Sequence, residues 1–511
     1  MGVNKKLAAI NTIVSYLRTI LNVGLSLFTV RWIMRALGEQ DYGLYFLVGG
    51  IVACLSFISM SLQASSTRYF SCSMDRDICE IQKWFSASVF LHLGCALLVL
   101  LASVPTYFIS FRCFFVIPVN RVMACKLVYW CAAASMCVSI LNVPFASMYV
   151  AKQRIFELTI LQITNGVMLF VFAYCLLELS GDRLIIYAVG VFLVNVIICT
   201  FQGIRCLSCF KEARILRFVS IGKDRFLSIL SFSWLSLLDT LSYMLRGQGV
   251  QIVFNRFGSA GLNASYSVAN QLSTQTNVLA AAVVSALSPG IMAQYGNGDI
   301  EGAGIWCVRT CKISTVLALM AFIPIYVECP YLMDLWLTTQ PTGCVEFVRA
   351  MAITYLITKF VTGGNILIRA QGEIGAYTRW TALSYLSALP VAAGIVFLGF
   401  DVKWVIYSFV ISTIGYAIVT LVRACALAGF SFREWSCHVL GAGLILLIIG
   451  FVCALGICSI MPQSFIRVVL IVFVNASILI AGALGLMLKV EERDFVLNKV
   501  RLMLIHRSKR L

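Results

Sequence analysis

The sequence predicts an all-α protein that crosses a membrane many times, and three observations support this prediction. The chain has 511 residues, of which 60% are hydrophobic and only 12% are charged, about half the charged share of a soluble domain. The mean hydropathy is +0.93. Apolar runs of about 20 residues, the length that a membrane helix needs, recur at intervals of roughly 36 residues. Because these intervals leave no room for a soluble domain, we expect one polytopic helical bundle.

We expect about 14 transmembrane helices, one for each apolar run of spanning length. The predicted spans are 8–30, 42–63, 85–109, 123–145, 155–178, 184–204, 228–254, 263–288, 304–327, 345–368, 376–398, 404–422, 435–459 and 468–488. The first run follows two lysines but lacks a small-residue cleavage site, so we interpret it as a span and not as a signal peptide. The first, seventh and eighth spans are the most polar.

Lysine and arginine are distributed unevenly between alternate loops. If the N-terminus is cytoplasmic, the segments on that side contain 24 of the 39 lysine and arginine residues, and the opposite segments contain 8. Positive residues collect on the cytoplasmic side of membrane proteins. We therefore expect both termini in the cytoplasm. The net charge of +17 reflects this bias, and we expect no nucleic acid partner.

Two stretches of the chain share a pattern that indicates an internal repeat. A glycine turn precedes a helix at Gly38 and at Gly258, and an Asp-Ile pair follows at Asp77 and Asp299 after similar distances. In both copies a tryptophan comes seven residues after the aspartate. The pattern predicts two six-helix lobes that both start on the cytoplasmic side, related by an axis along the membrane normal.

The repeat divides the chain into five predicted parts around a central cavity. These are an N-lobe at 1–205, a basic cytoplasmic linker at 206–227, a C-lobe at 228–430, two appended spans within 431–488 and a basic tail at 489–511. The tail has apolar residues at helical spacing among cations, so we expect it to lie on anionic lipid headgroups.

Polar side chains inside the predicted spans fall on single helix faces, which cannot point at lipid. Cations outnumber anions there, and each central charge costs roughly 2.5 to 3.5 kcal/mol, so we expect these residues to bind a ligand or a partner side chain. Guanidinium groups suit phosphate because they donate paired hydrogen bonds. The candidate ligand contacts are Arg18, Asn22, Arg246, Lys359, Asn270 and Asn277. Hydrogen bonding between helices is the alternative role for such groups.

Asp239 is the candidate for ion coupling or for charge pairing, because Arg246 lies two turns later on the same helix face. We expect no cofactor, no bound metal and no catalytic residue. The chain has no GxxxxGK[ST] motif for nucleotide phosphates. Its three histidines have no serine or cysteine nucleophile in a plausible arrangement.

The segment Leu37-Gly-Glu-Gln-Asp-Tyr-Gly-Leu-Tyr45, followed by LVGGIVA and by SSTRYFS around Arg68, resembles the amino-terminal signature of bacterial polysaccharide flippases. This family belongs to the multidrug, oligosaccharidyl-lipid and polysaccharide exporter superfamily. The two six-helix lobes and the cytoplasmic termini that we predict are similar to its architecture across nearly the whole chain.

The resemblance implies a transporter, not an enzyme. It would move undecaprenyl-pyrophosphate-linked oligosaccharide repeat units across the bacterial inner membrane by alternating access, for the synthesis of O-antigen, capsule or another surface polysaccharide. Arg18 and Arg246 would hold the pyrophosphate, and the polar helix faces would solvate the sugars. The implied partners are this lipid-linked substrate, membrane lipids and the polysaccharide polymerase or ligase machinery, and the protein would be a monomer.

Two other functions stay open at this point. A drug or cation antiporter of the same superfamily would prefer an acidic, aromatic cavity, which the excess of cations argues against. A membrane glycosyltransferase or polymerase acting on lipid-linked sugars would need external carboxylates, for which Glu39 and Asp41 are the candidates. We interpret this acidic pair as part of the turn that begins the second span.

Overall fold

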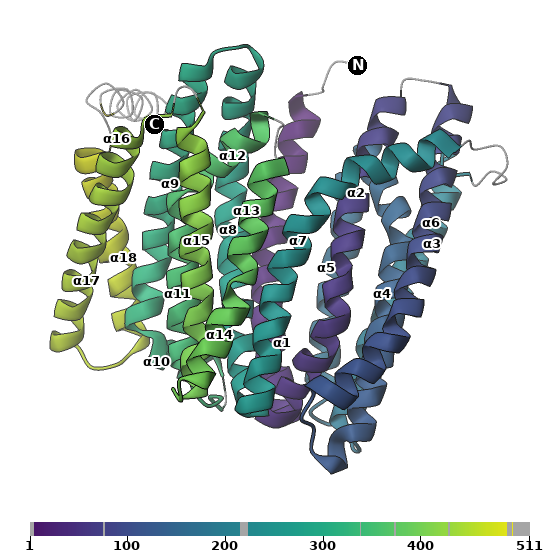
Figure 1. Ribbon diagram of the computed structural model, residues 1–511, viewed down its shortest axis with the longest axis horizontal. Coiled ribbons are helices and arrows are strands. Elements are labelled where there is room, and N and C mark those ends of the chain that lie inside the picture. The colour runs from purple at the N-terminus through teal and green to yellow at the C-terminus, as the bar shows by residue number, and fades with distance from the viewer. Residues whose placement is uncertain are drawn as a thin grey trace, which may run out of the picture. The chain divides into compact units, whose positions relative to one another are not determined.

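A computed structural model of the chain describes residues 5–74, 77–214, 223–337, 339–371, 375–427, 430–487 and 493. Side chains of residues 5–18 and of parts of α2, α7 and α8 lie outside this description. Within the described residues every regular element is a helix and no β-strand occurs, which confirms the all-α prediction (Figure 1). The predicted tail, 489–511, lies outside the described residues except for Arg493.

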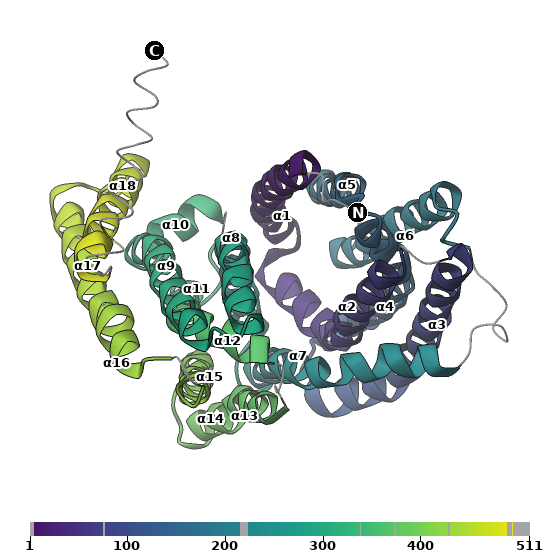
Figure 2. The ribbon, with the colours of Figure 1, turned by 90° about the horizontal axis from the view of Figure 1, so that it is seen from above.

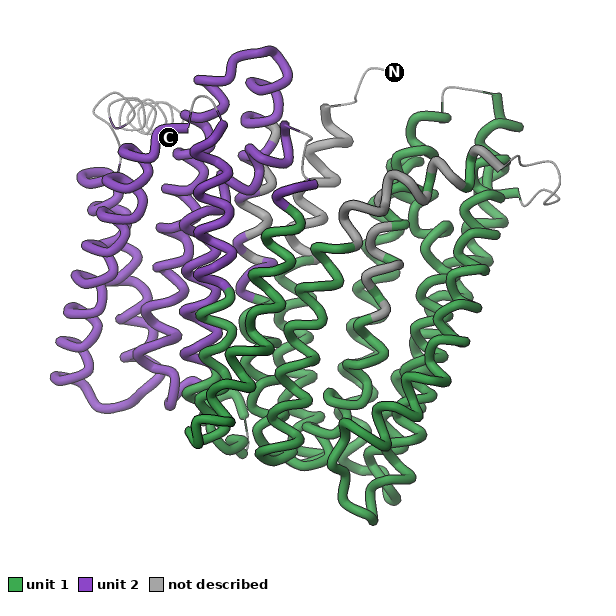
Figure 3. The backbone as a smooth tube through the Cα atoms, viewed as in Figure 1, with its two compact units in different colours: residues 1–275, 334–347, 378–412 green, residues 276–333, 348–377, 413–511 purple. Residues whose placement is uncertain are grey.

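Two compact units divide the chain (Figure 3). Unit 1 comprises Met1–Gln275, Asp334–Phe347 and Thr378–Ser412, and unit 2 comprises Thr276–Met333, Val348–Tyr377 and Thr413–Leu511. This grouping follows packing and not the chain order of the predicted lobes, whose boundaries stay a prediction.

Unit 1 is built mainly from long helices of the first half of the chain. They are α1 (Lys5–Ala53), α2 (Phe57–Ser73), α3 (Ile78–Ile109), α4 (Val122–Ala151), α5 (Ile155–Cys175), α6 (Arg183–Cys209) and α7 (Lys223–Phe257), with η1 (Cys54–Ser56), η2 (Ser110–Phe114), η3 (Val119–Arg121), α14 (Ala388–Phe397) and η5 (Val402–Ile406). In the view from above, α1 packs against α5, α5 against α6, α6 against α4, and α4 against α1 (Figure 2).

Unit 2 contains the helices of the carboxyl-terminal part. They are α9 (Ile300–Val327), α12 (Thr362–Gln371), α16 (Phe432–Trp435), η6 (Ser436–Gly441), α17 (Ala442–Ile460), α18 (Phe465–Gly482) and η7 (Ala483–Met487). Five helices contribute residues to both units: α8 (Ala260–Gly296), α10 (Cys329–Trp336), α11 (Cys344–Phe360), α13 (Gly375–Leu386) and α15 (Tyr407–Cys425).

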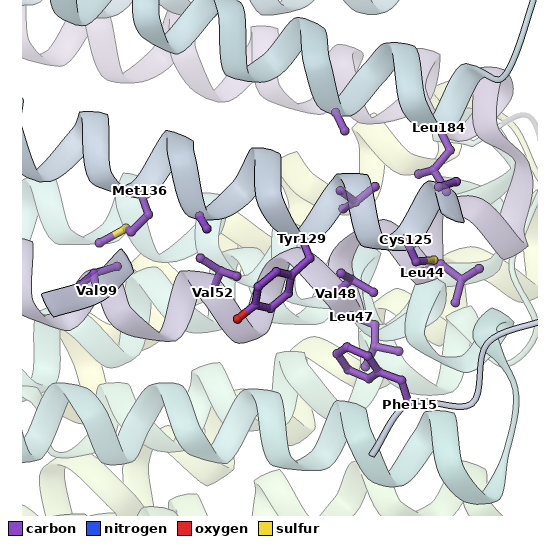
Figure 4. Packing of buried hydrophobic residues seen from close by; sticks show 14 of the residues in the cluster. Leu44, Leu47, Val48, Val52, Val99, Phe115, Cys125, Tyr129, Met136 and Leu184 are labelled. Carbon is purple, nitrogen blue, oxygen red and sulfur yellow. The ribbon is translucent and has the colours of Figure 1, made fainter. Parts of the chain in front are cut away.

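An apolar cluster between α1, α3, α4 and the start of α6 forms a core of unit 1 (Figure 4). Leu47, Val52 and Val128 are buried there beside the aromatic ring of Tyr129. The Tyr129 hydroxyl donates to the backbone oxygen of Ser103 at 2.7 Å, so its one polar atom is satisfied inside the core.

The glycine turn predicted at Gly38 is present in the structure as a sharp kink between two helical segments. α1 continues to Ala53 and is broken at a single residue, Gly38, which has a φ of 75°. A residue without Cβ adopts this conformation at little cost. Gly43 then packs against α8, where a Cβ would lie 2.0 Å from the Ala260 carbonyl oxygen.

The two acidic residues of the same segment hold neighbouring chain segments. Asp41 is buried and paired with Arg121, which also donates to Asp182 at 2.9 Å. Glu39 accepts a hydrogen bond from the backbone N–H of Thr342 at 2.8 Å. The signature therefore has a local structural role in which a kink, an ion-pair network and a close helix contact follow one another along α1.

The predicted number of 14 membrane crossings is not confirmed. Among the described residues, 10 helices are long and apolar enough to span a membrane, or 11 if the bent pair α11 and α12 counts as one span. The first predicted span and the first part of the second lie in α1, and the second continues through η1 into α2. The helices α7 and α8 are long enough to span a membrane but contain many hydroxyl and amide side chains. The helices themselves follow the predicted ranges closely, and a multi-pass membrane protein is confirmed.

In unit 2 the last two long helices pack on α9 around a buried ion pair. Arg467 of α18 donates to Glu328 at 2.7 Å, and the Glu328 side chain is 1% exposed. The Cys458 thiol of α17 donates to the same carboxylate at 3.3 Å. These contacts join α17 and α18 to the carboxyl end of α9.

Candidate functional site

Unit 1 contains a half-open cavity of about 610 Å³ that is lined by parts of α1, α4, α5, α6 and the start of α8. This volume lies within the roughly 300–1,000 Å³ that is typical of small-molecule sites. All residues that line it belong to unit 1.

The polar lining comes from residues at helical spacing, so that each helix turns one polar stripe toward the same space. The stripes are Asn22, Ser26 and Thr29 on α1; Ser139 and Asn142 on α4; Gln162 and Asn165 on α5; Asn195, Cys199 and Gln202 on α6; and Gln271 and Gln275 on α8. Apolar side chains such as Leu161, Leu169 and Ile198 complete the wall.

The described lining is rich in amides and free of full charges. Eight of the residues that line the cavity are asparagine or glutamine, and none of those described is Asp, Glu, Lys, Arg or His. Each amide group offers both hydrogen-bond donors and an acceptor. The described lining can therefore both donate hydrogen bonds to a polar ligand and accept them from it.

Hydrogen bonds between lining residues fix several of the amides. Asn142 Nδ2 donates to Gln202 Oε1 at 3.1 Å, which joins α4 to α6. Asn195 Nδ2 donates to the Ser139 hydroxyl at 3.1 Å and to a backbone oxygen of α4 at 2.9 Å. Side chains that are oriented in this way lose less conformational entropy when a ligand binds.

A similar contact joins α8 to α1. The Ser26 hydroxyl accepts hydrogen bonds from Gln271 Nε2 and from Gln275 Nε2, the latter at 2.8 Å. These two glutamines are the contribution of α8 to the described lining.

Three lining amides have polar atoms without a hydrogen-bond partner. These atoms are Asn22 Oδ1, Asn142 Oδ1 and Gln202 Nε2, all buried. An unsatisfied buried polar group costs about 1–3 kcal/mol, and such groups are rare in native structures. Three such groups therefore belong to residues that line this cavity, and others occur elsewhere in the described chain.

α1 and α5 approach closely beside Asn22 because Gly166 has no side chain. A Cβ at Gly166 would lie 3.1 Å from Asn22 Oδ1. Gly166 and Asn22 both line the cavity, so this glycine determines how far the Asn22 side chain can reach.

The predicted site residues of unit 1 occupy different environments. Asn22 lines the cavity, whereas Asn270 is half-buried and is not among the lining residues. The Arg18 side chain lies outside the described residues. Asp239 Oδ1 accepts a hydrogen bond from the Thr381 hydroxyl at 3.0 Å.

Arg246 is only 4% exposed and lies among aromatic rings. Its Cζ is 5.1 Å from the ring centroid of Tyr243 and 4.9 Å from those of Tyr385 and Phe409. Its Nη1 also donates to the Ser412 hydroxyl at 3.1 Å. Cation–π attraction and this hydrogen bond stabilise the guanidinium, and we call this group of side chains the Arg246 cage.

The two remaining candidates, Lys359 and Asn277, belong to unit 2. Lys359 is 9% exposed, and its Nζ lies 5.0 Å from the ring centroid of Tyr355. Asn277 is half-buried on α8. Their role in binding stays a prediction, as does that of the other candidates.

Sequence reasoning missed most of the lining amides, notably Asn142, Gln162, Asn165, Asn195 and Gln202. A signal was present, because the amides of α5 and α6 recur at steps of three or seven residues inside otherwise apolar runs. That spacing places them on one helix face. It could have been read as a cavity lining in the same way as the stripe at Asn22.

The fold is that of a multi-pass helical membrane protein with a polar cavity in unit 1. The structure superimposes on the lipid II flippase MurJ in an inward closed conformation with a TM-score of 0.71 and 11% identity, over 93% of this chain and 98% of that one. It is also similar to an outward-facing multidrug resistance transporter of the MATE family, with a TM-score of 0.55 and 14% identity over 86% of this chain and 96% of that one.

A transporter of the same superfamily from Pyrococcus furiosus matches with a TM-score of 0.54 and 14% identity over 81% of this chain and 93% of that one. No curated protein sequence matches the chain. Residues 8–294, more than half of the chain, match the model of the family described as polysaccharide biosynthesis protein. The chain belongs to this family, which confirms the resemblance seen in the signature segment.

Proposed function

We propose that the protein is a flippase that moves a lipid-linked oligosaccharide across the membrane. The observation that carries this proposal is the amide-lined cavity, whose described residues carry no charge, in a chain of a polysaccharide biosynthesis family. The likeness of its fold to a lipid II flippase supports the proposal, because lipid II is named there as the transported molecule.

The chemistry of the cavity fits the sugar part of such a substrate. Sugar hydroxyls lose their hydrogen bonds to water when they leave it, and each bond left unmade costs about 1–3 kcal/mol. Amides and hydroxyls at helical spacing can replace those bonds within the bundle, while the lipid chain stays in the bilayer. The protein then needs only to open the cavity first to one side of the membrane and then to the other.

The finer proposal is that the substrate is an undecaprenyl-pyrophosphate-linked repeat unit in a bacterial inner membrane, with both termini in the cytoplasm. Arg18 is proposed as a pyrophosphate contact, because it precedes the cavity residue Asn22 by one helical turn. The same role for Arg246 requires its guanidinium to leave the rings of its cage. Lys359 and Asp239 stay candidates for phosphate binding and for ion coupling.

The alternatives receive less support from the described residues. A cation antiporter gains no carboxylate from the described cavity lining. A glycosyltransferase that used Glu39 and Asp41 would have to release them from Thr342 and Arg121. We therefore propose transport without covalent chemistry.

Gln202→Leu tests the proposal, with Gln251→Leu as a matched control. Both glutamines are 4% exposed and each has an unpartnered polar atom, but only Gln202 lines the cavity. We expect Gln202→Leu to lower transport about tenfold, the equivalent of about 1.4 kcal/mol, and Gln251→Leu to leave it within about twofold.

The measurement is surface polysaccharide in a bacterial strain that lacks its own flippase, together with the amount of lipid-linked intermediate that accumulates and the amount of inserted protein. Loss of polysaccharide with accumulation of intermediate supports transport. Accumulation of the unextended acceptor lipid instead would contradict it and favour a transferase. Equal effects of the two variants would remove the cavity from the mechanism.

A further inference from the structure

One end of the cavity is aromatic. The described lining contains two aromatic side chains, Phe46 of α1 and Tyr187 of α6. Both pack against Tyr45, whose ring centroid lies 5.3 Å from that of Phe46 and 4.8 Å from that of Tyr187. Tyr187 lies in the second turn of α6, before the lining amides Asn195 and Gln202 of the same helix. The two rings therefore lie close together, at one end of the polar stripe of α6.

Neighbouring rings hold Tyr187 in place. Phe172 of α5 stacks on the Tyr187 ring, with a centroid distance of 6.3 Å and an angle of 7° between the ring planes. Phe172 fits there because Gly190 of α6 has no side chain, and a Cβ at Gly190 would lie 2.0 Å from Phe172 Cζ. A ring that Tyr45 and Phe172 already fix loses little conformational freedom when a ligand contacts it.

The Tyr187 hydroxyl forms no hydrogen bond with any residue that the structure describes, although the residue is only 8% exposed. Buried tyrosine hydroxyls usually have a partner, as that of Tyr129 does. Because Tyr187 lines the cavity, a ligand bound there can supply the missing hydrogen bond.

A sugar ring has the chemistry that this pair of side chains can bind. A pyranose has a face of C–H groups and a rim of hydroxyl groups. The C–H hydrogens carry a small positive charge, which the negative face of an aromatic ring attracts. A tyrosine hydroxyl can both donate to a sugar hydroxyl and accept from it. A lining phenylalanine next to a lining tyrosine offers both contacts to one ring.

We propose that the aromatic end of the cavity, formed by Phe46 and Tyr187, is a subsite for one sugar ring of the transported substrate. The inference rests on the proposed flippase function and adds two residues that recognise the sugar. Phe46 contacts the C–H face of the ring, and the Tyr187 hydroxyl bonds to a polar group on its rim. The subsite recognises the sugar and not the lipid carrier or its phosphates.

The experiment compares a sugar-bearing probe with its sugar-free carrier on the full chain in nanodiscs. The probes are undecaprenyl pyrophosphate with and without a single N-acetylglucosamine. Binding is measured as the probe concentration that gives half of the maximal shift in thermal unfolding. We expect the sugar to strengthen binding about tenfold, as one hydrogen bond and one ring contact together would. Flipping of the sugar-bearing probe is measured separately in proteoliposomes.

Two substitutions remove one contact each. Tyr187→Phe removes the hydroxyl and keeps the ring in its packing, so it should weaken binding of the sugar-bearing probe about threefold. Phe46→Leu removes the aromatic face and should cause a similar loss. In both variants the sugar-free carrier should bind as before. If Phe46→Leu lowers the unfolding temperature without a probe, Tyr187→Phe alone decides the test.

Tyr149→Phe and Phe111→Leu are the matched controls. The Tyr149 hydroxyl is also buried without a partner, and Phe111 is also half-buried among aromatic rings. Neither residue belongs to the described lining of the cavity. Both controls should bind the two probes as the unsubstituted protein does.

Three results would overturn the subsite. They are unchanged binding of the sugar-bearing probe by Tyr187→Phe, equal losses for both probes, and the same losses in the controls. Failure of the sugar to strengthen binding by the unsubstituted protein would overturn it as well. Flipping by the unsubstituted protein alongside any of these results would leave the flippase standing. Sugar-dependent binding that Tyr187→Phe weakens, without any flipping by the unsubstituted protein, would support the subsite while the flippase proposal fails.

Discussion

The cavity and the Arg246 cage are both polar features of unit 1, but they differ in how far their polar groups are satisfied within the protein. In the cage a full charge is surrounded by three aromatic rings and bonded to the Ser412 hydroxyl. In the cavity, neutral amides line an open volume and three of them keep unpartnered atoms. A charge inside a membrane bundle must be stabilised wherever it lies. Amides cost less to bury, so a chain can leave some of them available to a ligand.

Arg246→Ala should have the largest effect on folding, and it tests whether the cage is structural. The change removes three cation–π contacts and a hydrogen bond, so we expect a loss of about 3 kcal/mol in unfolding free energy. The measurement is thermal unfolding of the purified protein in detergent. Arg246→Lys keeps the charge near the rings and should lose less than half as much. Normal stability of Arg246→Ala with abolished transport would instead make Arg246 a ligand contact.

Gly43→Ala should come next, because α1 meets α8 there without room for a side chain. The added Cβ would lie 2.0 Å from the Ala260 carbonyl oxygen, and relief of this clash should cost about 1–3 kcal/mol. The control is Gly49→Ala on the same helix, where nothing lies within 4 Å of the added atom. That change should be neutral or stabilising. Similar unfolding temperatures for the two variants would contradict the close contact.

Gly166→Ala should have the smallest effect on stability, and it tests whether Gly166 positions the cavity residue Asn22. Its Cβ would meet the Asn22 side-chain oxygen at 3.1 Å and not backbone, so we expect a loss of less than about 1 kcal/mol. Displacement of Asn22 should lower transport about twofold to threefold. In a double variant with Asn22→Ala, Gly166→Ala should have no further effect on the transport rate. Additive losses would show that Gly166 acts through another residue.

The sequence predicted the helices well because hydrophobic periodicity and glycine breaks are local signals. The span predicted at 155–178 corresponds to α5, Ile155–Cys175, and the expected break fell at Gly38. The count of membrane crossings was less accessible. α7 and α8 are helices whose polar side chains lower their apolar character, and sequence alone cannot decide whether such a helix spans the bilayer.

The site was only partly predictable, since a cavity depends on which helix faces meet. Asn22 was identified from its stripe on the first span, and it does line the cavity. Asn142 and Gln202 are 60 residues apart and become informative only when α4 and α6 bring them within hydrogen-bond distance. Arg246 was identified from its charge, and Tyr243 lies three residues before it on α7. The other two rings, Tyr385 and Phe409, come from other helices that no local pattern connects to it.

The ion pair between Arg467 and Glu328 means that the last two long helices cannot be treated as a removable appendage. A chain shortened before α17 would keep the Glu328 carboxylate at the end of α9 but would lose its counter-ion and the Cys458 thiol. Removal of one partner from a buried ion pair costs about 3–5 kcal/mol. Truncated proteins would therefore misfold for an electrostatic reason, and their inactivity would say nothing about whether α17 and α18 touch the cargo.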